Sequence, residues 1–296
     1  MSAVERLDLD DAPPPARAPW WRALLADPAA ALALLVFMAI VAAAILAPVL
    51  APFDPAESSR AMMRPPAWAA RGLPQHLLGT DGQGRDILSR LLHGARLTLL
   101  IGLVAVTVGG GVGSLLGLLG AFYPRLDPWI MRGADVMLSF PAILLGLALV
   151  AVMGAGVAPV IIALAIATIP DSARIARSIA ESVMKQEFIE AGRAVGLSDA
   201  ALFTRYLARN CVSSIMVFMS LRFGQVILLG AALSFLGLGA RPPAAELGMM
   251  ASQGRDAMLL APHVAIIPSL AIFVIVLTVN IAGDALRDVL DPRLRT

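Results

Sequence analysis

The sequence predicts an all-α polytopic membrane protein with six transmembrane helices. Of its 296 residues, 58% are hydrophobic and only 15% are charged, and the mean hydropathy is +0.80. Soluble domains of this length carry more charge, and long uncharged runs are typical of membrane spans. Such runs cover residues 28–53, 97–124, 136–170, 223–240 and 264–283.

The uncharged runs divide into six spans. A helix needs about 20 residues to cross ~30 Å of hydrocarbon at ~1.5 Å per residue. The run over 136–170 would be roughly 52 Å long as one helix, so it is interpreted as two. The segment 154–159, Gly-Ala-Gly-Val-Ala-Pro, supplies the break, because glycine and proline disfavour helix interiors. The predicted spans are 29–50, 97–123, 134–153, 157–173, 211–236 and 264–283.

These spans imply an order for the rest of the chain. The first apolar stretch is too long for the core of a cleavable signal, so we expect it to remain a transmembrane helix. A cytoplasmic loop is expected at about 178–210, within the helical core. The expected parts are a polar cytoplasmic tail over 1–28, the first helix over 29–50, a periplasmic loop over 51–96, a five-helix core over 97–283 and a cytoplasmic tail over 284–296.

The distribution of basic residues predicts the orientation. With six spans both termini lie on one side of the membrane. That side, which includes the two tails, the connection over 124–133 and the loop over 174–210, holds 14 Lys and Arg residues, and the other side holds 7. Because cytoplasmic loops carry the excess of positive charge, both termini and the 178–210 loop are predicted to be cytoplasmic.

Several kinds of chemistry lack the residues they need. Lys185 is the only lysine and no glycine-rich segment precedes it, so the chain has no P-loop. The three histidines are scattered, which argues against a metal site, and no cofactor motif is present. We expect a lipid bilayer around the chain and no nucleic-acid partner.

Ionisable residues are scarce within the predicted spans. Carriers coupled to protons or ions usually need them there. Arg222 is the exception, about three turns into the fifth span. We expect it to face a subunit interface or a water-filled cavity, and direct contact with substrate is the alternative.

The second span carries glycines at a regular spacing. Gly109, Gly113 and Gly117 recur every four residues, and small residues at this spacing let two helices approach closely. Helix packing is the favoured interpretation. A position along a translocation path or at a subunit interface is the alternative.

The loop over 187–199 is charged and helix-forming, and it lies between long apolar segments. Glu190-Ala191-Gly192, with Gly196 four residues on, resembles the "EAA" loop of bacterial ABC importer permeases. Four other segments are similar to the dipeptide/oligopeptide/nickel branch of that family: 78–86, 139–141, 233–243 and 283–293. Taken in order they cover most of the chain from Leu78 onward, and the chain resembles a C-type permease.

Two departures from the family pattern stand out. Gly192 replaces the usual alanine, and Arg209 stands where proline is common. Glycine costs about 1 kcal/mol of helix preference relative to alanine, so we expect a looser loop or an adjusted partner ATPase.

The resemblance implies the type I ABC importer permease fold and a function. The chain would be the transmembrane permease subunit of an ATP-driven importer, forming half of the translocation path in the bacterial inner membrane. Its implied partners are a homologous second permease, two ATP-binding subunits and an external solute-binding protein. Di- or oligopeptides are the expected cargo, and glutathione-like molecules and nickel complexes stay open. A stand-alone secondary carrier or channel is the alternative, and no catalytic constellation supports an intramembrane enzyme.

The resemblance also implies which residues couple the chain to the ATPase: Glu190, Ala191, Gly192, Arg193, Gly196 and Asp199. The residue spacing agrees, because Gln186, Glu190 and Arg193 share one face of a helix. Gly196 allows a sharp turn and Ser198 can cap the helix that follows. Apolar side chains that we expect to press into a groove of the partner are Ile189, Val195, Leu202 and Phe203.

Overall fold

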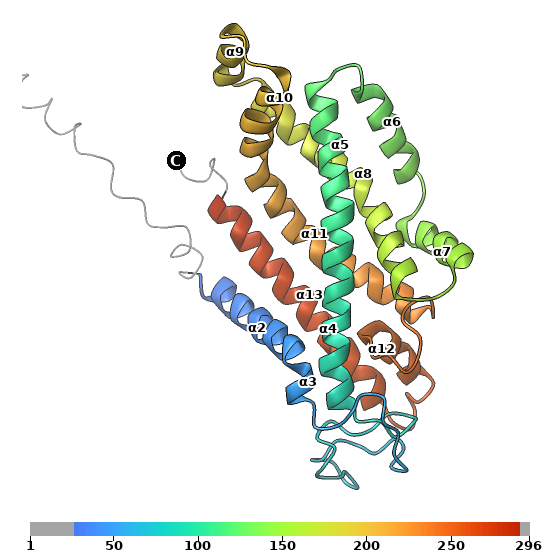
Figure 1. Ribbon diagram of the computed structural model, residues 1–296. Helices are drawn as coiled ribbons and strands as arrows, with labels where there is room; N and C mark the ends of the chain where they lie inside the picture. Colours follow the sequence, from blue (N-terminus) through green and yellow to red (C-terminus); the bar gives the residue numbers. More distant parts are fainter. Residues whose placement is uncertain (1–26, 291–296) are drawn as a thin grey trace, which may run out of the picture.

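The computed structural model describes residues 27–290, and it is all-helical (Figure 1). Most of the tail predicted over 1–28 and the end of the tail predicted over 284–296 lie outside the described residues. The first helices are α2 (Pro28–Ile45) and α3 (Ala47–Leu50). An irregular segment over 51–86 follows. The chain then enters α4 (Ile87–Ala105), η2 (Val106–Gly110) and α5 (Gly111–Phe122), which form one long helix with a π-helical turn in its middle.

The next elements are α6 (Asp127–Leu138), α7 (Ala142–Met153) and α8 (Val157–Met184). The predicted break over 154–159 is confirmed, since α7 ends at Met153 and α8 begins at Val157. The prediction of one helix over 134–153 is wrong, because α6 and α7 meet at a bend of 86°. Pro141 explains the bend: it has no N–H to donate, and it disfavours a helical conformation at Phe140.

The last elements are α9 (Glu187–Ala194), α10 (Asp199–Ala201), η3 (Leu202–Ala208), α11 (Arg209–Phe235), α12 (Leu247–Arg255) and α13 (His263–Leu290). Several helices are longer than the predicted spans. The second begins at Ile87 rather than at 97, because Asp86 caps it by accepting a hydrogen bond from the Ser89 N–H at 2.7 Å. An uncharged run predicts only the part of a helix that lies in lipid. The helix itself continues into polar sequence beyond that part.

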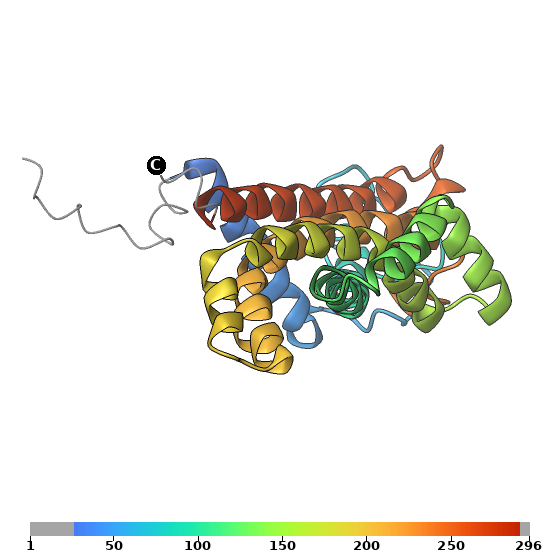
Figure 2. The ribbon, with the colours of Figure 1, turned by 90° about the horizontal axis from the view of Figure 1, so that it is seen from above.

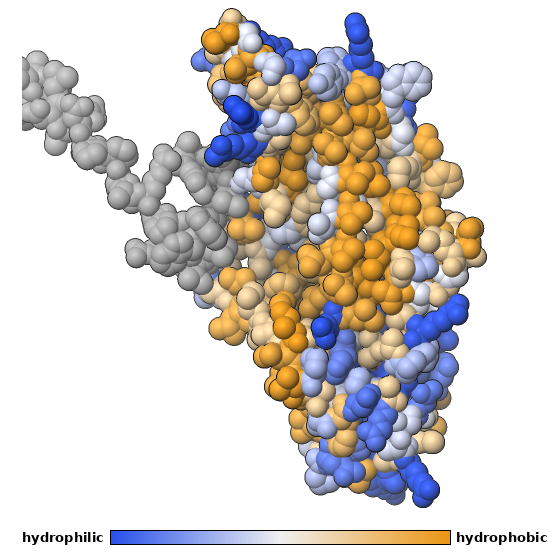
Figure 3. Space-filling view, viewed as in Figure 1, coloured by the Kyte–Doolittle hydropathy of each residue, from blue (hydrophilic) through white to orange (hydrophobic). Residues whose placement is uncertain are grey.

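The fold is suited to a membrane. Within residues 27–290, five helices are long and apolar enough to cross it, and the bent α6–α7 pair makes up to six. Figure 3 shows an apolar band across the middle of the molecule, with hydrophilic residues gathered toward the two ends. The all-helical, multi-span architecture predicted from the sequence is therefore confirmed.

The two ends of the bundle are built differently. The irregular segment over 51–86 lies at one end, close to α12, and α9 and α10 lie at the other (Figure 1). Helix α11 packs against both α8 and α13, and in the view from above α9 and α10 form a separate ledge (Figure 2). Four apolar clusters of buried residues lie along the described part of the bundle, the fourth at the end near α12.

The spaced glycines hold the centre of the fold together. A Cβ atom on Gly109, Gly113 or Gly117 would lie 2.1, 2.4 or 2.2 Å from a carbonyl oxygen of α8. The three glycines therefore face α8 of the same chain, and helix packing is the correct interpretation. The backbone of α8 occupies the space beside them, and the alternative of a place on a translocation path or at a subunit interface stays a prediction.

This packing leads to a first prediction. Gly109→Ala should lower the free energy of unfolding by about 1–3 kcal/mol, because the new methyl group meets the Ala165 carbonyl and not a side chain that can move aside. Gly111→Ala is the matched control, since no atom of another described helix lies within 4 Å of its Cβ position. Thermal unfolding of the purified variants in detergent measures both, and equal melting temperatures would contradict the role given to Gly109.

Candidate coupling site and transmembrane cavity

Helix α9 is set up by its own sequence. Glu187 and Glu190 lie in its first turn and Arg193 in its last. Acidic groups near the N-terminus and a basic group near the C-terminus both interact favourably with the helix dipole. The eight-residue helix is thus stabilised by charges that stay exposed to solvent.

A tight turn at Gly196 ends α9. The Gly196 N–H donates to the Arg193 carbonyl at 3.0 Å, and the Leu197 N–H donates to the Gly192 carbonyl at 3.1 Å. This pair of bonds is the Schellman motif, which needs a residue of positive φ, and Gly196 has a φ of 82°. Ser198 then caps the next helix by accepting from the Ala201 N–H at 3.4 Å, as predicted.

The inner side of α9 belongs to the core of the chain. Ile189 and Leu202 are each 1% exposed, and Leu202 packs in a cluster with Leu118 and Phe122 of α5. Phe203 stacks edge-on against Phe122 with ring centroids 5.5 Å apart. The prediction that these apolar side chains press into a partner is therefore wrong for Ile189 and Leu202, because the chain's own helices bury them. Phe203 is partly buried against the same cluster.

The packing around α9 explains why position 192 is a glycine. Gly192 is buried, and a Cβ atom there would lie 2.8 Å from Leu202 Cδ2 and 3.2 Å from Leu197 Cδ1. The expectation of a looser loop is not met, since the glycine lets α9 approach η3 closely. The departure from the family's usual alanine is thus matched by tight packing inside this chain.

The outer side of α9 is polar. Gln186, Glu190 and Arg193 are all exposed, which confirms that they form one solvent-facing side. Val195 is the one apolar side chain of the predicted set that points outward, with 83% of its surface exposed. Of the residues assigned to coupling, Gly192 is buried, and those that lie at the surface are Glu190, Ala191, Arg193, Gly196 and Asp199.

A second candidate site is a cavity of about 360 Å³ between α6, α7, α8 and α11. Phe140 and Pro141, from the bend between α6 and α7, line one side, and Arg222 of α11 and Asp171 of α8 line another. Arg222 forms an ion pair with Asp171 and donates to Gln225 Oε1 at 2.6 Å. Arg222 thus lines a cavity within this chain, and its place at a subunit interface or in a water-filled cavity stays a prediction.

Asp171 escaped the sequence analysis. It lies at the inner end of the predicted fourth span, where an acidic residue is easily taken for a solvated one. An unpaired charge is costly in a membrane. An acidic residue in one long apolar helix and a basic residue in another therefore could have predicted this ion pair. Arg222 Nε is buried and has no hydrogen-bond partner within residues 27–290, so the pair keeps a free donor.

A bundle of membrane-length helices, with a rigid polar helix at one end and a charged cavity among the spans, defines a membrane transport subunit. The chain belongs to the family described as the binding-protein-dependent transport system inner membrane component, whose model matches residues 113–296. Residues 18–66 match the N-terminal transmembrane domain of oligopeptide transport permease C. The resemblance inferred from the sequence is therefore confirmed, and the chain is an ABC importer permease.

Curated relatives agree over nearly the whole chain. The glutathione transport system permease protein GsiD of Pectobacterium atrosepticum is 44% identical, over 95% of this chain and 93% of its own. The di/tripeptide transport system permease protein DppC of Pseudomonas aeruginosa is 42% identical, over 93% of this chain and 92% of its own.

Solved structures share the fold at low sequence identity. A chain of the inward-facing MetNI methionine ABC transporter has a TM-score of 0.57 at 20% identity, covering 68% of this chain and 97% of its own. A chain of an amino acid ABC transporter with histidines has a TM-score of 0.51 at 19% identity, covering 67% and 92%. Both support the permease fold.

The partly buried ion pair of Arg222 and Asp171 gives the second prediction. Asp171→Asn alone should destabilise the chain, because it leaves Arg222 as an uncompensated charge among apolar helices. The double variant Asp171→Asn/Arg222→Gln should recover part of the loss, with a coupling free energy of roughly 0.5–3 kcal/mol. Thermal unfolding of the four proteins completes the cycle, and purely additive effects would show that the two side chains do not interact.

Proposed function

We propose that the chain forms half of the translocation path of an ATP-driven importer of short peptides. The observation that carries this proposal is the rigid ledge made by α9, Gly196 and α10, which presents a polar surface at one end of the bundle while its inner side is fixed in the core. Such a ledge can pass the motion of a docked ATPase to the spans as a rigid body.

The path itself is assigned to the cavity at the α6–α7 bend. An ionisable pair that faces a cavity among membrane helices usually marks a substrate pathway. A volume of about 360 Å³ lies within the common range for small-molecule sites. Arg222 therefore keeps the role of lining the path, and Asp171 joins it.

The partners follow from the chemistry that the chain lacks. It has no P-loop, so two ATP-binding subunits supply the energy by docking at the exposed residues of α9 and α10. A homologous second permease provides the other half of the path, and a solute-binding protein delivers the cargo. The apolar side chains exposed along the spans, among them Leu103, Val108 and Leu115, suit either lipid or this second permease.

The cargo is assigned to peptides of two or three residues. The similar permeases carry names for glutathione and for di- and tripeptides, and glutathione is itself a tripeptide. Free peptides are zwitterions, and the cavity offers one cation and one anion side by side. The alternative of a stand-alone secondary carrier predicts uptake without any ATPase.

The orientation puts α9 in the cytoplasm. The 14-to-7 bias of basic residues supports cytoplasmic termini and a cytoplasmic loop over 178–210 in a bacterial inner membrane. It places the segment 51–86 and α12 outside. The last part of the predicted 51–96 segment is helical, because α4 already begins at Ile87.

The coupling prediction concerns Glu190 and Gly196. Glu190→Ala should lower peptide-stimulated ATP hydrolysis and uptake about tenfold, because a charge-assisted hydrogen bond across the docking interface contributes ~1.5–3 kcal/mol. Gly196→Asp should have a similar effect by distorting the turn, and Gly196→Asn should be milder, since asparagine tolerates a positive φ. The measurement is uptake and ATPase rate in proteoliposomes at matched protein levels.

Glu57→Ala serves as the control, since Glu57 is an equally exposed carboxylate at the opposite end of the bundle. Wild-type coupling in Glu190→Ala and Gly196→Asp would place the docking surface elsewhere. Peptide uptake by the permease subunits without ATP-binding partners would replace the importer by the secondary carrier.

The topology prediction uses cysteine labelling in intact cells. A cysteine at Asp199 should resist a membrane-impermeant reagent until the membrane is opened, and a cysteine at Arg60 should react at once, because both side chains are exposed and lie at opposite ends. The background is low, since the one native thiol, Cys211, is buried. Labelling at Asp199 from outside would reverse the assigned orientation.

A further inference from the structure

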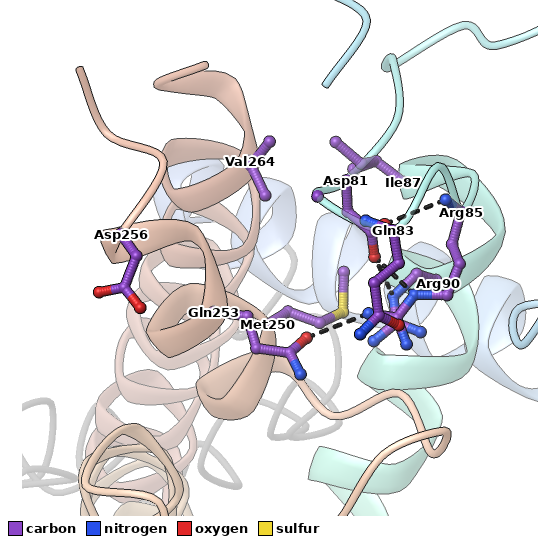
Figure 4. Close-up of a pocket in the computed structure, with 10 residues that line it drawn as sticks. Asp81, Gln83, Arg85, Ile87, Arg90, Met250, Gln253, Asp256 and Val264 are labelled. Atoms are coloured by element: carbon purple, nitrogen blue, oxygen red, sulfur yellow. Dashed lines mark hydrogen bonds and ion pairs between the residues drawn. The ribbon is translucent and has the colours of Figure 1, made fainter. Parts of the chain in front are cut away.

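A second polar cavity lies at the end of the bundle opposite α9. Its volume is about 290 Å³, and it is enclosed by the irregular segment before α4, the start of α4, α12 and the start of α13. Figure 4 shows Arg85 and Arg90 on one side and Asp256 on the other, with Gln253 and Met250 between them. The coupling site and the cavity at the α6–α7 bend share none of these residues.

The basic wall of this cavity is rigid. Asp81 accepts hydrogen bonds from the backbone N–H groups of Gln83 and Arg85 at 2.8 and 3.0 Å. Its other oxygen lies 2.7 Å from Arg85 Nε and 3.4 Å from Arg90 Nε. One carboxylate thus faces two guanidinium groups, and the wall keeps an excess positive charge.

Arg90 carries the free donor of this wall. Its side chain is 1% exposed, and its Nη1 donates to the Pro55 carbonyl at 3.0 Å. Its Nη2 is buried without a hydrogen-bond partner among the residues that the structure describes, and Arg90 lines the cavity. A buried guanidinium with an unused N–H favours an acceptor that brings negative charge, and a carboxylate fits its geometry best.

The opposite wall has the complementary charge. Asp256 is exposed, and its only ion pair among residues 27–290 is a long one of 3.5 Å to Arg255. A ligand that spans the cavity therefore meets a cation at one end and an anion at the other. Ile87, Met250 and Val264 are buried and give the space between them apolar sides.

We propose that this cavity binds a small zwitterion of the peptide class, with its carboxylate on Arg90 and its ammonium group toward Asp256. The proposal rests on the function given above, and it adds a holding site on the outer face, where cargo arrives before it enters the spans. The modest volume suits a short peptide better than a long one.

The test is equilibrium binding of radiolabelled dialanine to the assembled importer in nanodiscs without ATP. Dialanine should bind saturably, and dialanine amide, which lacks the carboxylate, should bind about tenfold more weakly or worse, because it loses a charge-assisted bond. Equal affinity for dialanine and its amide would overturn the proposal, and so would the absence of saturable binding.

Variants locate the binding. Arg90→Gln removes the proposed contact but also the bond to Pro55, so Gln83→Glu is the decisive variant. Gln83 is exposed and lines the cavity, and the change leaves both arginines with their partners Asp81 and Pro55. A carboxylate there competes with the ligand and should weaken dialanine binding about tenfold. Asp256→Asn should weaken binding of dialanine but not of N-acetyl-dialanine, which has no ammonium group.

Arg60→Gln is the control, since Arg60 is an exposed arginine in the same segment that does not line the cavity. Unchanged binding in Gln83→Glu would place the dialanine elsewhere, for example beside Arg222, and would overturn the proposal. Binding that follows this pattern in an importer that shows no ATP-driven uptake would refute the transport function and leave the site standing.

Discussion

The fold depends on the close approach of η2 and α5 to α8. Three glycines, one per turn, let the two backbones meet with no side chain between them. Because lipid is as apolar as leucine, membrane helices gain little by hiding apolar surface and associate through packing of this kind. Helix α8 is therefore fixed along much of its length, and it bears Asp171 near its middle and leads into α9 at its end.

The proposed coupling role of α9 depends on the residues that bury its inner side. Ile189 and Leu202 bury the inner side of the ledge, and the ring pair Phe122–Phe203 joins it to α5. The same α5 packs on α8 through its glycines, so the ledge and two spans share one rigid core. A force applied at Glu190 has a short, packed route into the membrane, and no long flexible linker intervenes.

Charged side chains have different surroundings at α9, among the spans and at the opposite end of the bundle. At α9 it is exposed, and the helix dipole is enough to organise it. Among the spans, Arg222 and Asp171 are paired, since an isolated charge is costly there. At the far end, buried Arg90 keeps an unused donor beside a cavity. Within residues 27–290, Arg90 and Arg222 are the two guanidinium groups with a buried N–H that has no partner, and a ligand is proposed at each.

The sequence by itself determined the fold class, the break at 154–159, the turn at Gly196 and the polar side of α9, because uncharged runs, glycine, proline and helical spacing act locally. The order of motifs along the sequence also predicted the family. Only the tertiary structure decided that the α6–α7 pair is bent by 86°, that α8 fills the space beside the glycines, and that Ile189 and Leu202 face inward. It alone brought Asp171 to Arg222 and Arg90 to α12. The physical reason is that local rules fix which side of a helix is apolar, whereas the neighbour that covers it depends on contacts between residues distant in sequence.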